Sequence, residues 1–148
     1  MATVTATTTR RVEAPAERVL AALADYRDVR PRLLPEQFTG YGVLEGGTGA
    51  GTVARWELHA TKKRVRSVVA DVSAPDAVSL VERDRNSTLT TTWRVVPAGA
   101  GASEVVVTTT WQGAGGVGGF FERTFAPRGL DRIYARVLEG LAREVAGR

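Results

Sequence analysis

The chain of 148 residues contains no cysteine and a single histidine, His59. The absence of cysteine excludes a disulfide framework, a thiolate zinc site and a thiol nucleophile. No clustered spacing of His, Asp or Glu suggests a metal ion, and no serine has a histidine partner by sequence order. The sequence therefore predicts no metal, no cofactor and no Ser-His-Asp triad.

The chain also lacks long apolar runs, and its N-terminus lacks the basic-then-apolar order of a secretion signal. No stretch approaches the roughly eighteen apolar residues that a membrane-spanning helix needs. Hydrophobic residues make up 43% of the chain and charged residues 24%, which is ordinary for a globular protein. We expect one domain over residues 1–148, located in the cytoplasm and without a membrane span.

A concentrated basic surface is missing as well, although the net charge is +4. Basic residues are interleaved with Asp and Glu, and the densest group is "KKRVR", Lys62 to Arg66. On an exposed strand pair such a short group more often discourages edge-to-edge aggregation than binds a polyanion. Nucleic acid is therefore not expected as a partner, and a ribosome contact remains a minor alternative.

Glycine is plentiful, and "GAGGVGG", Gly113 to Gly119, contains the G-x-G-x-x-G spacing of a dinucleotide-binding loop. That motif requires a buried parallel strand before it and another strand after the helix that it opens. Here the preceding segment alternates apolar and polar residues, and the residues that follow read as one helix. The segment is interpreted as a flexible strand-to-helix loop.

Most of the chain alternates with the period of two that is typical of strands with one covered face. Turn signals between the segments are short, which favours antiparallel neighbours because a parallel neighbour needs a long crossover. The predicted strands are residues 1–12, 38–46, 51–60, 63–73, 77–85, 89–98 and 103–112.

Helical spacing occurs at both ends of the chain. A short helix should begin near Pro15, and Pro31 and Pro35 limit the next segment to a small second helix or turn. A long C-terminal helix is expected to be kinked or broken near its start by Pro127. Burying its apolar stripe would contribute about 14 kcal/mol gross, so this helix should lie on the sheet. The stripe comprises Leu130, Ile133, Tyr134, Val137, Leu138, Leu141 and Val145.

The element order β-α-α-β6-α and three local motifs resemble the START and birch-pollen-allergen superfamily, especially its bacterial polyketide cyclase/dehydrase-like branch. The motifs are "VEAPAERVL" (Val12 to Leu20), "LEGGTGAGT" (Leu44 to Thr52) and the amphipathic C-terminal helix. The resemblance implies an α+β helix-grip fold, in which a curved seven-stranded antiparallel sheet wraps around the long helix. It also implies that both glycine-rich loops lie near an opening between the sheet and that helix.

A curved sheet that grips one helix tends to leave a hollow at its concave centre. A dry hollow of about 300 Å³ would cost roughly 7 kcal/mol, so it should be occupied, hydrated or filled by large side chains. If the more apolar strand faces point inward, aromatic residues line this space, either as a filled core or as a binding pocket. The candidate ligand-binding residues are Trp56, Leu58, Trp93, Val95, Val107, Trp111, Tyr26, Phe38, Tyr41, Phe120, Phe125 and Tyr134.

Three polar residues are further candidates. Arg10 shares the inward face of the first strand and is a candidate for an anionic head group, although its side chain can equally reach solvent at the strand end. His59 and Glu57 fall on the polar face of their strand. An outward orientation makes them surface residues, whereas a reversed face would make them an acid/base pair.

The first functional hypothesis is binding or carriage of a hydrophobic small molecule, such as a lipid, a polyketide or an aromatic compound. The second is a cyclase or dehydratase that acts on a polyketide-like or aromatic substrate in the same cavity. The third is an interaction module similar to the ribosome- or quinone-associated members of the superfamily. The side on which Glu57 and His59 lie should separate carriage from chemistry.

Overall fold

The computed structural model describes residues 3–59, 65–112 and 127–146. Most of the "KKRVR" group, the Gly113–Gly119 segment and the candidates Phe120 and Phe125 lie outside the described residues. Within the described part, no helix is long and apolar enough to cross a membrane.

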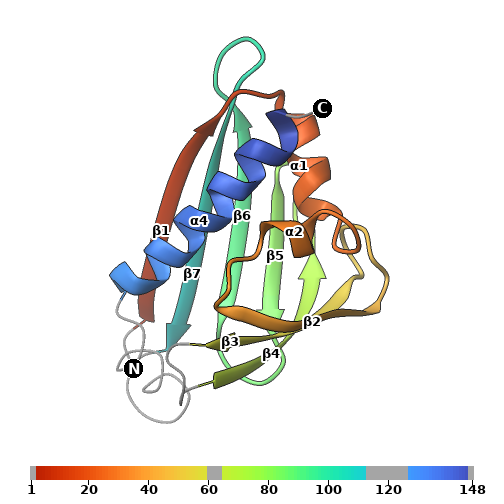
Figure 1. Cartoon of the computed structure of the whole chain (residues 1–148), viewed down its shortest axis with the longest axis vertical. Coiled ribbons are helices and arrows are strands. Elements are labelled where there is room, and N and C mark those ends of the chain that lie inside the picture. Colours follow the sequence, from red (N-terminus) through yellow and green to blue (C-terminus); the bar gives the residue numbers. More distant parts are fainter. Residues whose placement is uncertain (1–2, 60–64, 113–126, 147–148) are drawn as a thin grey trace.

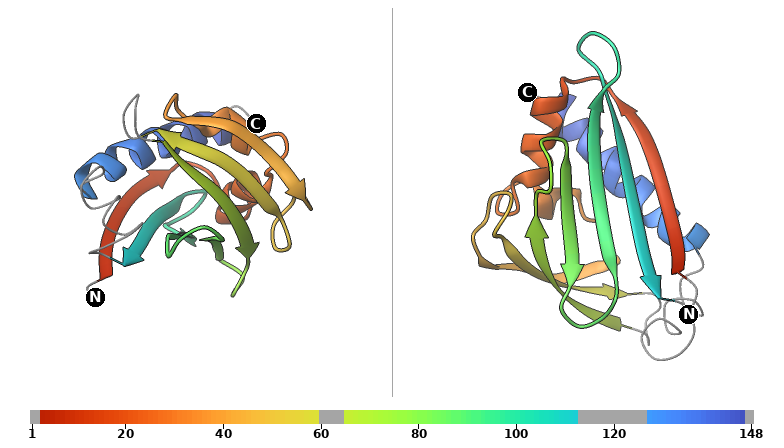
Figure 2. Two further views of the ribbon diagram at one scale, coloured as in Figure 1. Left: turned by 90° about the horizontal axis from the view of Figure 1, so that it is seen from below. Right: turned by 180° about the vertical axis from the view of Figure 1, so that it is seen from behind.

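Seven strands form one sheet in the order β1-β7-β6-β5-β4-β3-β2, and all neighbouring pairs are antiparallel. The sheet is strongly curved, so that β2 and β3 cross the direction of β1, β7 and β6 (Figures 1 and 2). Every strand predicted from period-two alternation is confirmed. Their bounds are β1 Thr3–Val12, β2 Phe38–Glu45, β3 Val53–His59, β4 Val65–Ser73, β5 Ser79–Asp84, β6 Thr90–Pro97 and β7 Ser103–Gln112.

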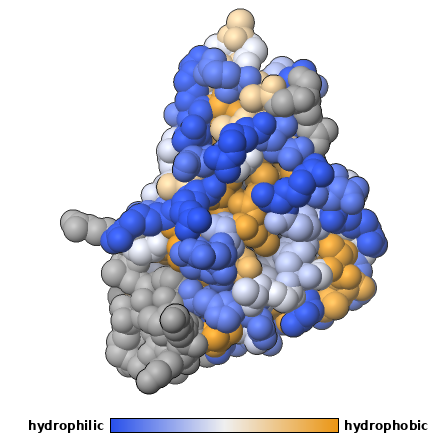
Figure 3. All heavy atoms as spheres, viewed as in Figure 1, coloured by the Kyte–Doolittle hydropathy of each residue, from blue (hydrophilic) through white to orange (hydrophobic). Residues whose placement is uncertain are grey.

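The helices are α1 (Ala16–Ala24), α2 (Arg30–Leu33) and α4 (Pro127–Ala146). Helix α4 packs on β1 and contacts both α1 and α2 (Figure 1). The seven residues of its predicted apolar stripe are all buried. Its outer side is charged and follows the blue diagonal band in Figure 3. The antiparallel sheet and the long helix confirm the predicted helix-grip fold.

The described part of α4 begins at Pro127, and the residues before it lie outside the described residues, so the expected kink or break at Pro127 stays a prediction. Further along α4, Gly140 allows close approach to α2: a Cβ there would lie 3.4 Å from the Leu33 Cα and carbonyl oxygen.

The glycine-rich hairpin between β2 and β3 is bound to the segment that follows α1. The Tyr26 N–H donates to the Gly47 carbonyl at 2.9 Å, and the Gly49 N–H donates to the Ala24 carbonyl at 2.9 Å. Gly47 has φ +145°, a backbone conformation that favours glycine. This loop is therefore attached to the end of α1, and its expected position near an opening between the sheet and the long helix stays a prediction.

Candidate functional site

The concave side of the sheet contains a buried ion pair that joins two distant parts of the chain. Arg30 is the first residue of α2, and Glu82 lies on β5, the central strand. Glu82 shares the inward face of β5 with Leu80, and both are buried, whereas Arg83 between Glu82 and Asp84 is exposed. Period-two alternation thus directs a carboxylate toward the core, where a charge is costly unless it is paired.

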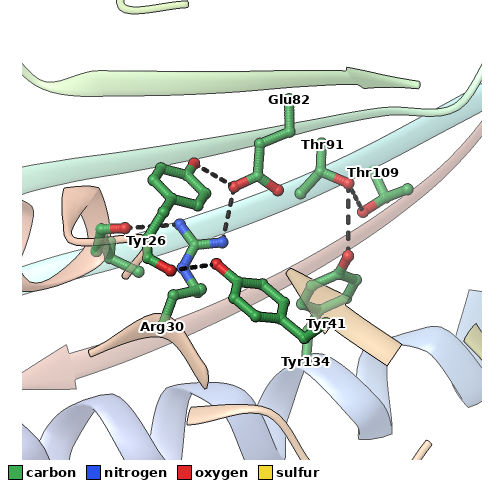
Figure 4. A network of polar contacts seen from close by, with 8 residues as sticks. Tyr26, Arg30, Tyr41, Glu82, Thr91, Thr109 and Tyr134 are labelled. Atoms are coloured by element: carbon green, nitrogen blue, oxygen red, sulfur yellow. Dashed lines mark hydrogen bonds and ion pairs between the residues drawn. The ribbon is translucent and has the colours of Figure 1, made fainter. Parts of the chain in front are cut away.

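The guanidinium of Arg30 has partners on several sides (Figure 4). Its Nη1 lies 2.7 Å from Glu82 Oε2, and its Nη2 donates to the Leu23 carbonyl at 2.8 Å. Its Cζ lies 4.4 Å from the ring centroid of Tyr26 and 4.9 Å from that of Trp93. The cation is therefore held between two aromatic faces as well as by its carboxylate partner.

Two tyrosines extend this network (Figure 4). The Tyr26 hydroxyl donates to Glu82 Oε2 at 2.5 Å, and the Tyr41 hydroxyl donates to the Tyr26 backbone carbonyl at 2.6 Å. Tyr41 belongs to the edge strand β2, so this bond connects the rim of the sheet to the buried ion pair.

Burial and the charge of Glu82 determine the ionisation of the network. Burial raises the pKa of Tyr26 well above its usual value, and the nearby Glu82 carboxylate adds to the increase. Burial is the largest single effect on Arg30 and lowers its pKa, but the charge of Glu82, its hydrogen bond and the two nearby tyrosines together outweigh burial, so the pKa of Arg30 is raised. At neutral pH the site therefore contains the Tyr26 phenol and the guanidinium of Arg30, which is paired with Glu82.

A second polar group lies on the α4 side of the same interior. The hydroxyls of Thr91 on β6 and Thr109 on β7 are 3.1 Å apart, and Thr91 Oγ1 lies 3.5 Å from the Tyr134 hydroxyl. Burial raises the pKa of Tyr134, and Glu82 acts in the same direction. This group connects the long helix to the inner face of the sheet.

Aromatic rings surround the polar network. Tyr41 stacks on Trp56 with ring centroids 6.3 Å apart, and Phe38 meets the edges of Trp56 and Tyr134, each at 6.4 Å. Trp93 contacts Tyr134 edge to face at 5.5 Å. These five rings come from β2, β3, β6 and α4 and form one continuous wall.

The interior is nearly filled, but two small cavities remain beside the ion pair. Each offers about 10 Å³ to the centre of a water molecule, about the minimum for one water. The first is bordered by Arg30, Leu34, Phe38, Tyr41, Trp56, Glu82, Trp93 and Tyr134. The second shares Trp56, Glu82 and Tyr134 with the first and extends toward Leu58, Asp84 and Thr91.

Most of the aromatic candidates meet at these cavities. Tyr26 contributes through its bond to Glu82, and Leu58 borders the second cavity. Val107 and Trp111 are buried in the core but border neither cavity, whereas Val95 borders a groove on the outside. The candidates at the two cavities are Phe38, Tyr41, Trp56, Leu58, Trp93 and Tyr134.

The polar candidates lie elsewhere. Arg10 shares the face of the buried residues Ala6 and Val12 on the edge strand β1, but its side chain is exposed and borders neither cavity. Its charge thus remains in water, and its role in ligand binding stays a prediction. His59 Nε2 lies 2.7 Å from the Thr39 hydroxyl on the outer side of β2 and β3. Glu57 shares that face with His59 and likewise borders neither cavity.

Sequence reasoning missed the ion pair itself. The available signal was Glu82, an acidic residue that shares one face of its strand with Leu80. Arg30 carried no such signal, because it precedes Pro31 in a segment rich in charged residues. Among the described residues, no group of three or more His, Asp or Glu side chains is placed to hold a metal ion.

A larger groove of about 690 Å³ lies between α1 and the loops before β5 and after β6. Alanine, glycine, proline and valine dominate its walls, and Glu17 is its one ionisable residue among those described. Small-molecule sites usually combine apolar walls with several convergent polar groups. That combination is found at the internal cavities, which therefore form the candidate site.

Several solved structures have the same architecture as this chain. The KanY protein, solved by NMR, is 53% identical, with a TM-score of 0.88 over 99% of both chains. The Zhui aromatase/cyclase from Streptomyces sp. R1128 is 19% identical, with a TM-score of 0.68 over 99% of this chain and 93% of that one.

Norcoclaurine synthase from Thalictrum flavum, solved with dopamine and hydroxybenzaldehyde, is 16% identical. Its TM-score is 0.70, over 99% of this chain and 88% of that one. At such low identity, this likeness and that of the aromatase/cyclase show the fold alone. No curated protein matches the sequence significantly.

The family model described as "Polyketide cyclase / dehydrase and lipid transport" matches residues 3–146. This match spans all seven strands and the long helix, and it agrees with the sheet and helix arrangement described above. The chain therefore belongs to the polyketide cyclase/dehydrase and lipid transport family.

Proposed function

We propose that this protein binds a hydrophobic small molecule, of aromatic, polyketide or lipid type, at the two cavities between the sheet and α4. The observation that carries the proposal is the wall of five aromatic rings around a buried ion pair. Apolar walls with a few convergent polar groups are typical of small-molecule sites. Family membership supports the same class of ligand.

The cavities are smaller than any such ligand, so binding requires the wall to move. Strand β2 is the element that we expect to move, because it pairs with β3 alone and because its register with β3 is irregular at two places. It carries Phe38 and Tyr41, both half-buried. Displacing these two rings would join the cavities to solvent without breaking the central strands.

The three tryptophans provide a direct test. We would record the indole N–H signals by ¹⁵N NMR while titrating fatty acids, quinones and aromatic polyketides, and native mass spectrometry of the fresh protein would reveal retained ligands. The Trp56 and Trp93 signals should shift, whereas Trp111, which borders neither cavity, should shift little. Three unresponsive signals with every probe would exclude binding at this site.

An enzyme of the cyclase or dehydratase type is the second candidate. The observation that favours it is the Glu82 carboxylate, which borders both cavities and accepts a hydrogen bond from the Tyr26 phenol. A buried carboxylate is a suitable general base when a substrate proton comes within hydrogen-bond distance. Incubation with a poly-β-ketone and mass spectrometry for loss of water would test this candidate, with Glu82→Gln as the inactive control.

A further inference from the structure

We infer that the ligand of the internal site is a neutral molecule with a hydroxyl group, a phenol or an enol, bound between Glu82 and the indole N–H group of Trp93. This inference rests on the proposed binding function and specifies the chemical class of the ligand. It follows from the polar atoms that remain without partners beside the first cavity.

Two donors at this cavity lack acceptors. The Nε of Arg30 and the Nε1 of Trp93 are buried and have no hydrogen-bond partner among the described residues. Both residues border the first cavity together with Glu82. Buried donors are rarely left without an acceptor in native proteins, so Trp93 Nε1 indicates a missing oxygen atom. The Nε–H of Arg30 points away from Nη1, which binds Glu82, and is therefore not assigned to the same oxygen atom.

The Glu82 carboxylate also has an oxygen atom that accepts no hydrogen bond from the described residues. Both hydrogen bonds to the Glu82 carboxylate, from Arg30 and from Tyr26, end on Oε2. Within the described residues no donor contacts Oε1, although a carboxylate oxygen has two lone pairs to offer. Because Glu82 borders both cavities, a guest in either one can donate a hydrogen bond to this oxygen.

A hydroxyl group complements this set of atoms. It donates one hydrogen bond, as Glu82 requires, and accepts one, as Trp93 requires. A ketone can accept but would leave Glu82 Oε1 without a donor. A carboxylate would place a second negative charge beside Glu82, whose own charge is already matched by Arg30. In the free protein, a water molecule in each cavity would satisfy the same atoms.

Three probes of matching shape test the inference on the full chain at pH 7: 2-naphthol, 2-methylnaphthalene and 2-naphthoate. They share the ring system and differ in a neutral hydroxyl, a methyl and a carboxylate group. Calorimetry or NMR titration should give an affinity for naphthol at least about tenfold higher than for methylnaphthalene, because a site built for a hydroxyl discriminates against its absence. Naphthoate should bind most weakly.

Two variants test whether the N–H group of Trp93 causes the preference for naphthol. Trp93→Phe should remove most of the preference for naphthol over methylnaphthalene, because the N–H donor is lost. The smaller ring also changes the packing, but this change should affect the affinities for both probes alike. Trp111→Phe changes another buried tryptophan, one that borders neither cavity, and should retain the preference. In the wild-type protein, the Trp93 indole proton should move downfield with naphthol and not with methylnaphthalene.

The outcomes distinguish the inference from the function on which it rests. If no naphthalene derivative or other apolar probe binds, the proposed function fails. If the three derivatives bind with equal affinity, or naphthoate binds best, the hydroxyl inference is wrong and the binding function stands. If Trp93→Phe does not fold, the ranking of the three probes and the Trp93 proton shift in the wild-type protein decide the question.

Discussion

Arg30 on the short helix α2 and Glu82 on the central strand β5 form an ion pair of 2.7 Å, and both side chains are only 3% exposed. Buried ion pairs seldom stabilise a protein more than well-packed apolar residues would, because both ions lose their hydration. The pair nevertheless lies beside the two cavities and organises Tyr26 and Trp93 around them. This position is better explained by a binding role than by stability alone.

The energetic coupling of this pair can be measured with a double-mutant cycle. Arg30→Met or Glu82→Leu alone should lower the free energy of unfolding by about 3–5 kcal/mol, since each leaves one buried charge without its partner. The double variant should lose clearly less than the sum of the two single losses. Urea unfolding at pH 7 gives all four values. Single losses below about 1 kcal/mol would show that the charges reach solvent in the folded protein.

Alkaline titration tests the burial of the tyrosines. The chain has three, and the pKa of each is raised, above all by burial. An unfolded tyrosine releases its proton near pH 10, whereas the folded protein retains it. The stabilisation is therefore complete below pH 10 and is lost above it, by up to about 1.4 kcal/mol per pH unit for each tyrosine.

Tyrosinate absorbance should accordingly stay low until the chain unfolds, and then rise together with the loss of circular dichroism. The urea-unfolded protein serves as the control and should titrate near pH 10. A native tyrosine that titrates at that pH before any unfolding would contradict the buried positions described for Tyr26 and Tyr134.

Tyr41→Phe tests β2 as the moving wall. The change removes the hydrogen bond from the Tyr41 hydroxyl to the Tyr26 carbonyl and leaves the ring that stacks on Trp56. We expect a loss of about 1 kcal/mol in stability and faster exchange of a bound ligand, measured by NMR line shape. Thr39→Val, on the outer side of the same strand, removes the contact with His59 and should leave ligand exchange unchanged. Equal exchange rates in all three proteins would exclude entry at β2.

Gly140 sets the distance between α4 and α2. A Cβ at this position would lie 3.4 Å from the Leu33 backbone, which leaves no space for a larger side chain. Gly140→Leu should therefore cost about 1–3 kcal/mol through overpacking. Gly140→Ala should change stability by less than about 1 kcal/mol, because the better helix propensity of alanine offsets a contact at the limit of van der Waals distance. A thermal or urea unfolding series over the three proteins measures both effects.

Local patterns in the sequence were sufficient to predict the fold. Alternation of apolar and polar residues places Trp56 and Leu58 inward and Glu57 outward, because successive side chains on a strand point to opposite faces. Short turns impose antiparallel neighbours, and the stripe from Leu130 to Val145 on α4 is buried as expected. The same patterns selected the aromatic residues that border the two cavities. They also selected Val95, which borders the outer groove instead.

The sequence by itself therefore determined the order of the elements and the residues that face the interior, since both depend on spacing along a few neighbouring residues. Only the tertiary structure decided which of those residues meet. Arg30 and Glu82 are 52 residues apart, and no local rule pairs a helix residue with one position of a central strand. Their juxtaposition depends on how sharply the sheet curves and where α2 packs against it, which are properties of the whole packed core.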